Sequence, residues 1–260
     1  MPSGQACIDG VLTALADAKI SVTDEGLVRG DGIFEVMRLY DGVPYALDRH
    51  LARMERSAAG LRLELDIAAV RADVELMLSV GELDDEILRV MATRGGRRIL
   101  LFEAMPELHD TCTLGLLTYA PSRVLDGVKS LSYAANMLAG RLIHERGFDE
   151  ALLISPHGRV LECPTASFFA VDGDVVRTPP LSEHILDSIT RATVLEVVDV
   201  REEPITRSEL DTIDEAFIAS SIAEVLPVAR IEQRELPAPG LRTTEIAVAV
   251  RAAIAAATAR

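Results

Sequence analysis

The sequence has little positive charge and no long apolar run. Among its 260 residues, 41 are acidic and 26 are basic, which gives a net charge of −15 at pH 7. Nucleic acids and anionic membrane surfaces bind a basic face, so this balance argues against both partners. The longest stretch with almost no charged residues, 246–257, is interrupted by Arg251 and is too short to span a hydrocarbon layer of roughly 30 Å. A small anionic ligand stays compatible, because local cations and helix N-termini decide its affinity.

Cysteine is scarce and without pattern. Cys7, Cys112 and Cys163 are odd in number and far apart, and no CxxC pair is present. Such cysteines are typical of reduced thiols in a cytoplasmic protein. The chain does not open with a basic region followed by an apolar run, so we predict no secretory signal. We expect a soluble, cytoplasmic, globular protein with a core large enough to need no disulfide or metal.

Several common catalytic motifs are also missing. The sequence has no GxSxG, HExxH or Walker motif, and its five histidines lack the spacing of metal ligands, so we predict no metal site. Gly30-Asp31-Gly32 resembles the start of a dinucleotide-binding loop. A strand-like run follows it instead of a helix, and the Rossmann interpretation therefore fails.

Strand-like and helical segments alternate without a strict βαβ order. Asp41-Gly42 lies between two apolar runs, 33–39 and 43–47, and predicts a β-hairpin because both turn positions favour positive φ. Gly147 is suited to end a helix as a left-handed C-cap. The further expected strands are 87–93, 99–102, 112–119, 151–154, 159–162, 167–171, 175–177 and 215–220, and the expected helices begin at Asp48 and Thr243 or cover 69–80, 136–146, 188–198 and 208–211. This mixture favours an α+β fold.

Lysine occurs only twice, at Lys19 and Lys129. Lys129 lies in the segment Gly-Val-Lys-Ser-Leu-Ser-Tyr, between a linker candidate at 121–127 and a predicted helix. A lysine near apolar surface can have a lowered amine pKa and act as a Schiff-base nucleophile. Taken alone, Lys129 is better interpreted as a solvated surface lysine, and the blocks around it change that interpretation.

Sequence blocks follow one another in a recognisable order between about residues 20 and 230. They are Arg29-Gly30-Asp31-Gly32-Ile33-Phe34-Glu35, His50-Leu51-Ala52-Arg53-Met54, the stretch from Lys129 through 147–152 to Gly158-Arg159-Val160-Leu161-Glu162, Ser188-Ile189-Thr190-Arg191, and the run from Ser220 to Val228. Together they resemble the fold-type IV (class IV aminotransferase) family of enzymes that use pyridoxal 5′-phosphate (PLP). This family includes branched-chain and D-amino-acid aminotransferases and aminodeoxychorismate lyase. One block is a weak signal, whereas five in family order are specific.

The resemblance implies an architecture and a set of partners. The fold would have a smaller N-terminal α/β domain over 1–120, a linker at 121–127, and a larger β-barrel-like PLP-binding domain with flanking helices over 128–260. The cofactor would be PLP, and the small-molecule partners an amino acid or amine and a 2-oxo acid. The resemblance also implies a homodimer with substrate pockets completed across its interface.

The resemblance further assigns roles to single residues. Lys129 would be the aldimine lysine and the proton shuttle between the substrate Cα and the cofactor, and Glu162 would hold the pyridine nitrogen protonated. Arg53 would bind the phosphate, and Tyr133 the phenolic oxygen. The further phosphate-binding positions are Ser188, Ile189, Thr190, Ser220 and Ser221. The family usually has glycine where this chain has Ser188. This departure concerns the geometry of the turn and not the backbone N–H donors.

The substrate side is less defined by the sequence. Phe34 and five arginines lie in the N-terminal part, which in this family covers the cofactor: Arg38, Arg89, Arg94, Arg97 and Arg98. A substrate carboxylate needs a cation, and Arg38 or Arg89 lies on a strand expected to face the cleft. Arg89 also matches an arginine often seen in branched-chain members. A surface or interface salt bridge explains each arginine equally well, so the carboxylate-binding one stays open.

Two reactions share the same core motif. An aminotransferase moves the amino group from a donor to a 2-oxo acid, whereas aminodeoxychorismate lyase eliminates pyruvate. The strand 34–40 and the block Thr93-Arg94-Gly95-Gly96 look like those of transaminases and favour the first reaction. A non-enzymatic protein on the same fold is the third alternative. It would be favoured by loss of the lysine or the carboxylate, and both Lys129 and Glu162 are present.

Overall fold

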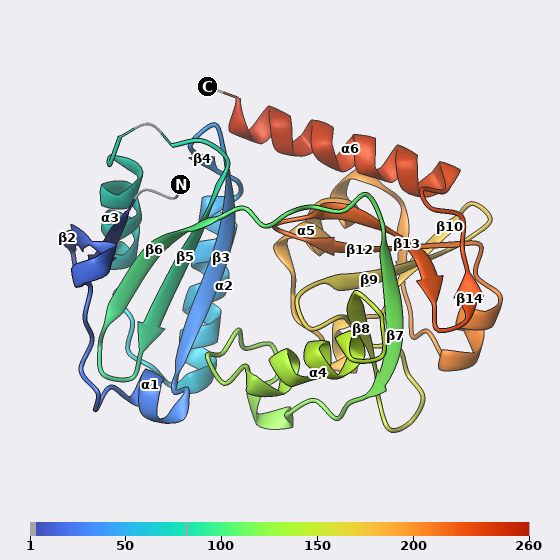
Figure 1. The fold of residues 1–260 in the computed structure, drawn as a ribbon, viewed down its shortest axis with the longest axis horizontal. Coiled ribbons are helices and arrows are strands. Elements are labelled where there is room, and N and C mark those ends of the chain that lie inside the picture. The colour runs from blue at the N-terminus through green and yellow to red at the C-terminus, as the bar shows by residue number, and fades with distance from the viewer. Residues whose placement is uncertain (1–3, 82, 260) are drawn as a thin grey trace. The chain divides into compact units, whose positions relative to one another are not determined.

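A computed structural model describes residues 4–81 and 83–259 of the chain. It divides into two compact units (Figure 1). Unit 1 contains the chain up to Pro106, the segment Gly127–Tyr133, and the C-terminal end from Ala257. Unit 2 contains Glu107–Asp126 and Ala134–Ala256. The chain therefore leaves unit 1 and returns to it for a short segment that includes position 129.

Unit 1 is built on a six-stranded sheet whose neighbouring strands are all antiparallel, in the order β2-β1-β6-β5-β3-β4. Its strands are β1 (Gln5–Ile8), β2 (Val11–Ala14), β3 (Gly32–Tyr40), β4 (Val43–Pro44), β5 (Glu86–Thr93) and β6 (Arg98–Ala104). Its helices are the 3-10 turn η1 (Leu15–Asp17), α1 (Glu25–Arg29), α2 (Leu47–Leu61) and α3 (Ile67–Leu78).

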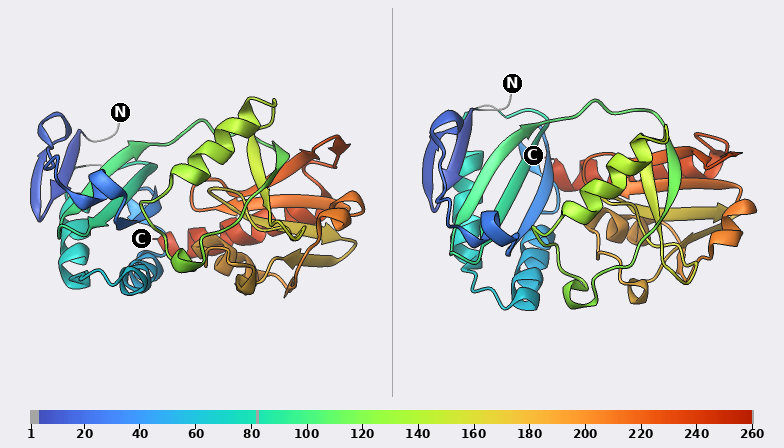
Figure 2. Two further views of the ribbon diagram at one scale, coloured as in Figure 1. Left: turned by 90° about the horizontal axis from the view of Figure 1, so that it is seen from below. Right: turned by 60° about the horizontal axis from the view of Figure 1, so that its bottom comes forward.

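The two faces of this sheet differ. Figure 2 shows α2 and α3 side by side on one face, which we call the helix face, and Ile33, Met37 and Leu39 of β3 pack there in the core with both helices. Side chains alternate along a strand, so the residues between them lie on the opposite face. On β3 these are Phe34, Val36, Arg38 and Tyr40. The opposite face of β3 thus carries two residues predicted for the substrate side.

Unit 2 is built on an eight-stranded mixed sheet in the order β11-β10-β9-β12-β13-β7-β8, with β14 paired to β13. Its strands are β7 (Cys112–Thr118), β8 (Glu150–Ile154), β9 (Ser167–Asp172), β10 (Val175–Thr178), β11 (Val200–Glu202), β12 (Glu215–Ser220), β13 (Glu224–Ile231) and β14 (Arg234–Glu235). Its helices are α4 (Ala134–His144), α5 (Ile189–Val197), most of α6 (Leu241–Thr258), and the 3-10 turns η2 (Arg123–Leu125), η3 (Leu181–Glu183) and η4 (Arg207–Asp211).

Apolar burial fixes the sheet of unit 2 and the helix beside it. Phe168 and Leu114 belong to the main core, and a smaller cluster forms where α4 meets β7 and β8. Gly115 of β7 permits this contact, because a Cβ there would lie 2.9 Å from atoms of both Ile143 and Phe148. Any larger residue at position 115 would push α4 away from the sheet.

Most predicted elements are present, with shifted ends. The hairpin is confirmed, with φ of 49° at Asp41 and 76° at Gly42. Its second strand ends at Pro44, because Ala46 turns into a left-handed conformation before α2. The helix predicted for 136–146 is α4, and Gly147 takes the expected positive φ of 83°. The helix predicted from Ser188 is α5, with Ser188 as its N-cap.

One predicted strand is wrong, one predicted helix takes the tighter 3-10 form, and other elements were missed. Residues 159–162 form no strand, because they join the fold only through isolated bridges, such as Ile154 to Val160, and single hydrogen bonds. The helix predicted at 208–211 is the 3-10 turn η4, tightened by a capping box between Thr206 and Glu209. The sequence analysis also missed β1 and β2, which have four residues each, and β13, which contains Pro227.

The mixed helix and strand content confirms the predicted α+β class. The compact units differ from the predicted boundaries, since β7 packs in unit 2 and Gly127–Tyr133 packs in unit 1. The predicted division into an N-terminal and a C-terminal domain, joined by a linker at 121–127, stays a prediction. Within the described ranges, no helix combines the length and apolarity needed to span a membrane.

Candidate functional site

The backbone on either side of Lys129 is tied to unit 1. The N–H of Lys129 donates to Ser57 Oγ at 3.1 Å, and its carbonyl accepts from Phe34 N–H at 3.1 Å. The next residue, Ser130, bridges Ile33. The segment therefore joins the start of β3 through an isolated bridge and single hydrogen bonds. These hydrogen bonds fix the base of the Lys129 side chain.

Gly32 allows this close approach. A Cβ at position 32 would lie 2.6 Å from Leu131 Cδ1 and 2.5 Å from the Ala92 carbonyl oxygen. Leu131 N–H also donates to the Gly32 carbonyl at 2.8 Å. The second glycine of the Gly30-Asp31-Gly32 sequence thus serves the packing of the lysine segment, and no dinucleotide loop is formed.

The Lys129 side chain lies beside two aromatic rings. Its amine is 4.4 Å from the centroid of the Phe34 ring and 6.0 Å from that of Tyr133. The two rings meet edge to face with centroids 5.3 Å apart. An ammonium is attracted to such ring faces, so the rings restrain where the amine lies. The structure brings together three residues that the sequence had placed in the site.

A buried charge cluster lies on the helix face of the same strand. Arg53 donates through Nε and Nη2 to the two oxygens of Glu35, at 2.8 and 2.6 Å. His50 Nδ1 lies 2.7 Å from Glu35 Oε2, and all three side chains are buried. Because an ionised carboxylate only accepts, His50 is the donor and carries its proton on Nδ1. We call these residues the Glu35 cluster.

The charges in the Glu35 cluster set its protonation. Burial by itself would raise the pKa of Glu35, but the hydrogen bonds and charge of Arg53, with help from His50, lower it to about 2. Burial lowers the pKa of His50, against the effect of Glu35 and with that of the nearby Arg53 and Lys129 charges. At neutral pH the cluster therefore holds an ionised Glu35 and an uncharged His50.

The Glu35 cluster changes the description of Arg53. The sequence predicted Arg53 as a phosphate ligand on an amphipathic helix, without a protein partner. In the structure its orientation is set by Glu35, a residue quoted in the resemblance but given no role. Glu35 is a charged residue at a core-facing position of a mostly apolar strand. This pattern indicates in the sequence that Glu35 needs a buried partner of opposite charge.

In unit 2, Glu162 lies beside the start of α5. Glu162 Oε1 accepts from the N–H of Leu186 at 3.1 Å, and Leu186 precedes Ser188 by two residues. Ser188 Oγ accepts from Arg191 N–H and caps the helix. The first amides of a helix have no acceptor within it and lie at the positive end of its dipole. Glu162 and the amides of Ile189 and Thr190 therefore belong to one region of unit 2.

The predicted serines occupy the turn after β12. Ser220 is the last residue of β12, and its Oγ accepts from Ala223 N–H at 3.1 Å. Ser221 follows in the turn that leads into β13. Helix α5 packs against β12, so both predicted phosphate-binding segments of this unit lie on neighbouring elements.

Tyr119 and Asn136 were missed by the sequence analysis. Tyr119 Oη donates to Asn136 Oδ1 at 3.4 Å, and Asn136 Nδ2 donates to the Pro164 carbonyl at 3.2 Å. Burial raises the pKa of Tyr119, and the negative charge of Glu162 raises it further. This places the Tyr119 hydroxyl near Glu162. Asn136 follows the Lys129 block in the sequence, but nothing local pairs it with Tyr119.

Lys129 and Glu162 lie in different units. Unit 1 brings Lys129, Phe34, Tyr133 and Arg53 into one neighbourhood, and unit 2 does the same for Glu162 and the α5 N-terminus. That Lys129 and Glu162 meet at one cofactor stays a prediction.

All five arginines considered for the substrate carboxylate form ion pairs within unit 1. Arg38 binds Asp85 at 2.8 Å, and Arg89 binds both oxygens of Glu103. The other pairs are Arg94 with Asp31, Arg97 with Asp9 and Arg98 with Asp73. Arg94 also donates to the carbonyls of Leu61 and Arg62 at the end of α2, which gives it a structural role.

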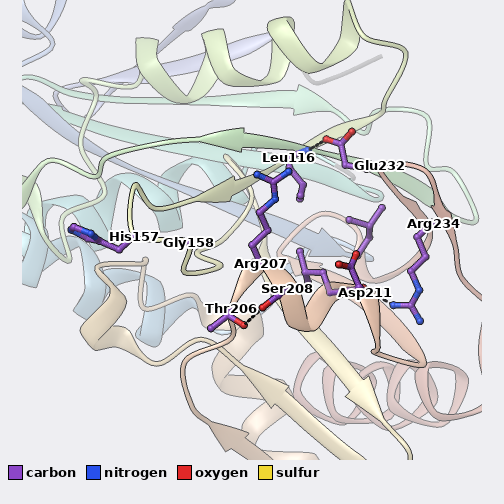
Figure 3. Close-up of a pocket in the computed structure, with 11 residues that line it drawn as sticks. Leu116, His157, Gly158, Thr206, Arg207, Ser208, Asp211, Glu232 and Arg234 are labelled. Atoms are coloured by element: carbon purple, nitrogen blue, oxygen red, sulfur yellow. Dashed lines mark hydrogen bonds between the residues drawn. The ribbon is translucent and has the colours of Figure 1, made fainter.

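A pocket of about 550 Å³ in unit 2 contains none of the predicted site residues (Figure 3). Two of its charged side chains, Arg234 and Glu232, hold the fold together. Arg234 donates to the carbonyls of Leu210 and Ile213, and Glu232 is paired with Arg146 while it accepts from Leu116 N–H. Within the described part of the chain, no group of three or more histidine, cysteine or acidic side chains is arranged to hold a metal ion.

Residues 32–231 match the family model of the class IV amino-transferases. The match covers more than half of the chain, which therefore belongs to this family, as the sequence blocks had indicated. Enzymes of this family use PLP. The predictions of an enzyme and of an aminotransferase are thereby confirmed.

The chain is similar to relatives with different named activities. It is 35% identical to a putative branched-chain-amino-acid aminotransferase of Methanocaldococcus jannaschii, over 87% of this chain and 88% of that protein. It is 31% identical to an aminodeoxychorismate lyase of Bacillus subtilis, over 84% and 83%. Its fold matches the branched-chain aminotransferase of Thermoproteus uzoniensis, solved with norvaline, at a TM-score of 0.90 and 27% identity, over 98% and 96%. These matches confirm the predicted fold of the family.

Proposed function

We propose that this class IV aminotransferase binds PLP through Lys129 and moves an amino group from an amino acid with an apolar side chain to a 2-oxo acid. The observation that carries the proposal is the placement of Lys129, whose backbone is hydrogen-bonded on both sides and whose amine lies beside Phe34 and Tyr133. Such fixation suits an amine that must reach one carbon atom repeatedly.

The donor groups present fit PLP. A phosphate needs a cation and hydrogen-bond donors, which Arg53, the first amides of α5, and the hydroxyls of Ser220 and Ser221 supply. A protonated pyridine nitrogen needs a carboxylate, and Glu162 supplies it. Tyr133 supplies a hydroxyl for the phenolic oxygen. The set thus contains a partner for each polar group of the cofactor.

Each of these residues has a separate task in the reaction. PLP, when bound, supplies an electron sink for negative charge at the substrate Cα. The Lys129 amine would take the proton from that Cα as general base and, as general acid, deliver it to the C4′ carbon of the cofactor. Phe34 and Tyr133 hold the amine and keep water from it. The Glu162 carboxylate, itself fixed by Leu186 N–H, holds the proton on the ring nitrogen.

The surroundings of Phe34 support an apolar donor. On the opposite face of the unit 1 sheet, Phe34 and Val36 of β3 lie beside Met91 of β5 and Leu101 of β6. Val36, Met91 and Leu101 are half-buried, so an apolar side chain placed on them loses contact with water. The branched-chain relatives agree with this chemistry.

We also propose a cytoplasmic homodimer. Helix α4 exposes Met137, Leu138 and Leu142 along one side, an apolar stripe that a second copy can cover. The cysteines are free and buried, and burial raises the pKa of each, as expected of thiols kept in a reducing compartment. Light scattering on the purified protein measures its mass, and a monomer at micromolar concentration contradicts the dimer.

The chain's second lysine provides the control for the main experiment. The protein is incubated with PLP, reduced with borohydride and digested, and the modified peptide is identified by mass spectrometry. We expect PLP on the peptide containing Lys129 and none on that containing the exposed Lys19. Lys129→Ala is expected to lower transamination by at least about a thousandfold. Lys19→Ala is expected to leave it unchanged, and PLP attached elsewhere would contradict the proposal.

A half-reaction separates the two activities of the family. The PLP-loaded protein is mixed with L-branched, L-acidic, D-alanine or (R)-amine donors alone, and conversion of the cofactor is followed by absorbance. Conversion by an apolar amino acid supports the proposal and reveals the handedness of the donor. Failure with every donor, together with pyruvate release from aminodeoxychorismate, would instead assign the lyase reaction.

A further inference from the structure

Arg89 and Glu103 form a two-pronged ion pair on the opposite face of the unit 1 sheet. Arg89 Nε donates to Glu103 Oε1 at 2.6 Å, and Nη2 donates to Oε2 at 2.9 Å. The residues come from adjacent strands, where Arg89 of β5 is paired with Leu101 and Glu103 follows two residues later on β6. This fork-to-fork arrangement is the one in which a guanidinium binds a substrate carboxylate.

The pair is next to the candidate reacting groups. The guanidinium carbon of Arg89 is 5.7 Å from the centroid of the Phe34 ring, and the Lys129 amine is 4.4 Å from the same centroid. The cation of Arg89 and the amine of Lys129 therefore both lie beside one phenyl ring. A substrate whose Cα lies at Lys129 would extend its side chain across Phe34 toward Arg89.

The pair is also accessible to a ligand. The side chains of Arg89 and Glu103 are 30% and 33% exposed, in contrast to the buried Glu35 cluster. Ion pairs that water reaches contribute little to stability, so the fold gains little from Glu103 at this place. A carboxylate from solution can replace Glu103 on the Arg89 fork, since it offers the same two acceptor oxygens.

We propose that Glu103 is a specificity-determining residue, an internal carboxylate that occupies Arg89 and disfavours substrates with a second carboxylate. A dicarboxylic substrate must displace Glu103, which then stays beside the incoming negative charge. A substrate with an apolar side chain leaves the Arg89–Glu103 pair intact and packs on Phe34 and its neighbours. This inference rests on the proposed function for the identity of the substrates.

The first test measures binding and needs no turnover. Glutarate carries two carboxylates but no group that can be transaminated, and 4-methylpentanoate carries one carboxylate and an apolar end. Calorimetry with the PLP-loaded protein gives the affinity of each. We expect Glu103→Gln to bind glutarate about fivefold more tightly than the wild type does, as suits the loss of one partly exposed competing charge. The affinity for 4-methylpentanoate is expected to stay the same.

Two further variants make this test specific. Asp48→Asn removes one negative charge from a more exposed ion pair of unit 1, that of Arg71 with Asp48, and is expected to leave both affinities unchanged. In a protein that already carries Arg89→Met, Glu103→Gln is expected to bring no gain in glutarate affinity, because the cation that glutarate would bind is missing. Circular dichroism of each variant confirms that it is folded.

The second test measures turnover. The ratio of kcat/KM for 2-oxoglutarate to that for 4-methyl-2-oxopentanoate is expected to rise about fivefold in Glu103→Gln. The proposal is overturned if glutarate affinity in this variant stays within twofold of the wild type, is undetectable, or rises equally in the Arg89→Met background. If glutarate binding responds as expected while no variant transaminates, the proposed function fails and the role of Glu103 as a barrier to dicarboxylates stands.

Discussion

The two units supply the candidate site with different kinds of chemical group. Unit 1 provides charged side chains held by other charged side chains, as in the Glu35 cluster around Arg53. Unit 2 provides mainly backbone N–H groups and hydroxyls at the start of α5 and after β12, with Glu162 as its acid. Substitutions in the Glu35 cluster should therefore disturb folding, whereas those of the groups that unit 2 supplies should disturb chemistry or little at all.

Glu35→Gln is expected to have the largest effect on stability. The amide leaves the buried Arg53 charge uncompensated, and breaking one side of a buried pair costs about 3–5 kcal/mol. Urea unfolding of the variant and the wild type measures this difference at pH 7. Asp48→Asn, in an exposed pair, is the control and should cost less than about 1 kcal/mol. A loss below 1 kcal/mol for Glu35→Gln would contradict the comparison.

Glu162→Gln is expected to show the reverse behaviour. An amide cannot hold the proton on the ring nitrogen, so turnover should fall by about a hundredfold to a thousandfold while PLP stays bound. The amide oxygen can still accept from Leu186 N–H, so stability should change by less than about 1 kcal/mol. Steady-state rates and urea unfolding test both statements. Glu183→Gln, whose contact with Arg159 is long at 3.9 Å, is the control.

Ser188→Ala should have a smaller effect, confined to the helix. Loss of the cap costs about 1 kcal/mol, but the amides of Ile189 and Thr190 remain. PLP affinity should therefore change little. Ser188→Gly, which introduces the residue usual in the family, should cost only a few tenths of a kcal/mol. A large loss of PLP from either variant would show that the serine hydroxyl, and not the backbone, binds the phosphate.

The smallest expected effect is a dependence of stability on pH. His50 has a lowered pKa in the folded protein, so the unfolded chain takes up the proton first as pH falls below about 6.5. Stability should decrease from pH 7.5 to 5.5, and this slope should be flatter in His50→Asn. Glu35 acts in another window. Its contribution is complete above the unfolded pKa near 4.3 and is lost as pH falls toward about 2.

Local features of the fold were predictable because they depend on neighbouring residues. The Asp41-Gly42 turn, the positive φ of Gly147 and the Ser188 cap were predictable because few residue types favour these backbone positions. The strand predicted at 159–162 was wrong because these residues contact β8 and the residues Ile205 and Thr206 through isolated bridges and single hydrogen bonds. A pattern of apolar residues in the sequence does not distinguish such contacts from a continuous ladder.

The charged partners of the site were not predictable in the same way. Glu35 meets His50 and Arg53 only because α2 packs on β3, and Arg89 meets Glu103 only because β5 and β6 pair in one register. The sequence identified Arg53, Arg89 and Lys129 through their resemblance to a family. It contained no information on which carboxylates would neutralise the two arginines, because these contacts depend on tertiary packing.

The path of the chain limits how this protein can be recombined with its relatives. Because Gly127–Tyr133 packs with strands that end some twenty residues earlier, the unit that carries Lys129 is not one continuous stretch of sequence. A chimera joined once, near residue 106, would seat a foreign lysine segment against the native Gly32 and Ser57. Exchange of the whole unit requires three grafts, since the C-terminal end from Ala257 also belongs to it, and a single crossover near residue 106 would separate the lysine from the sheet that positions it.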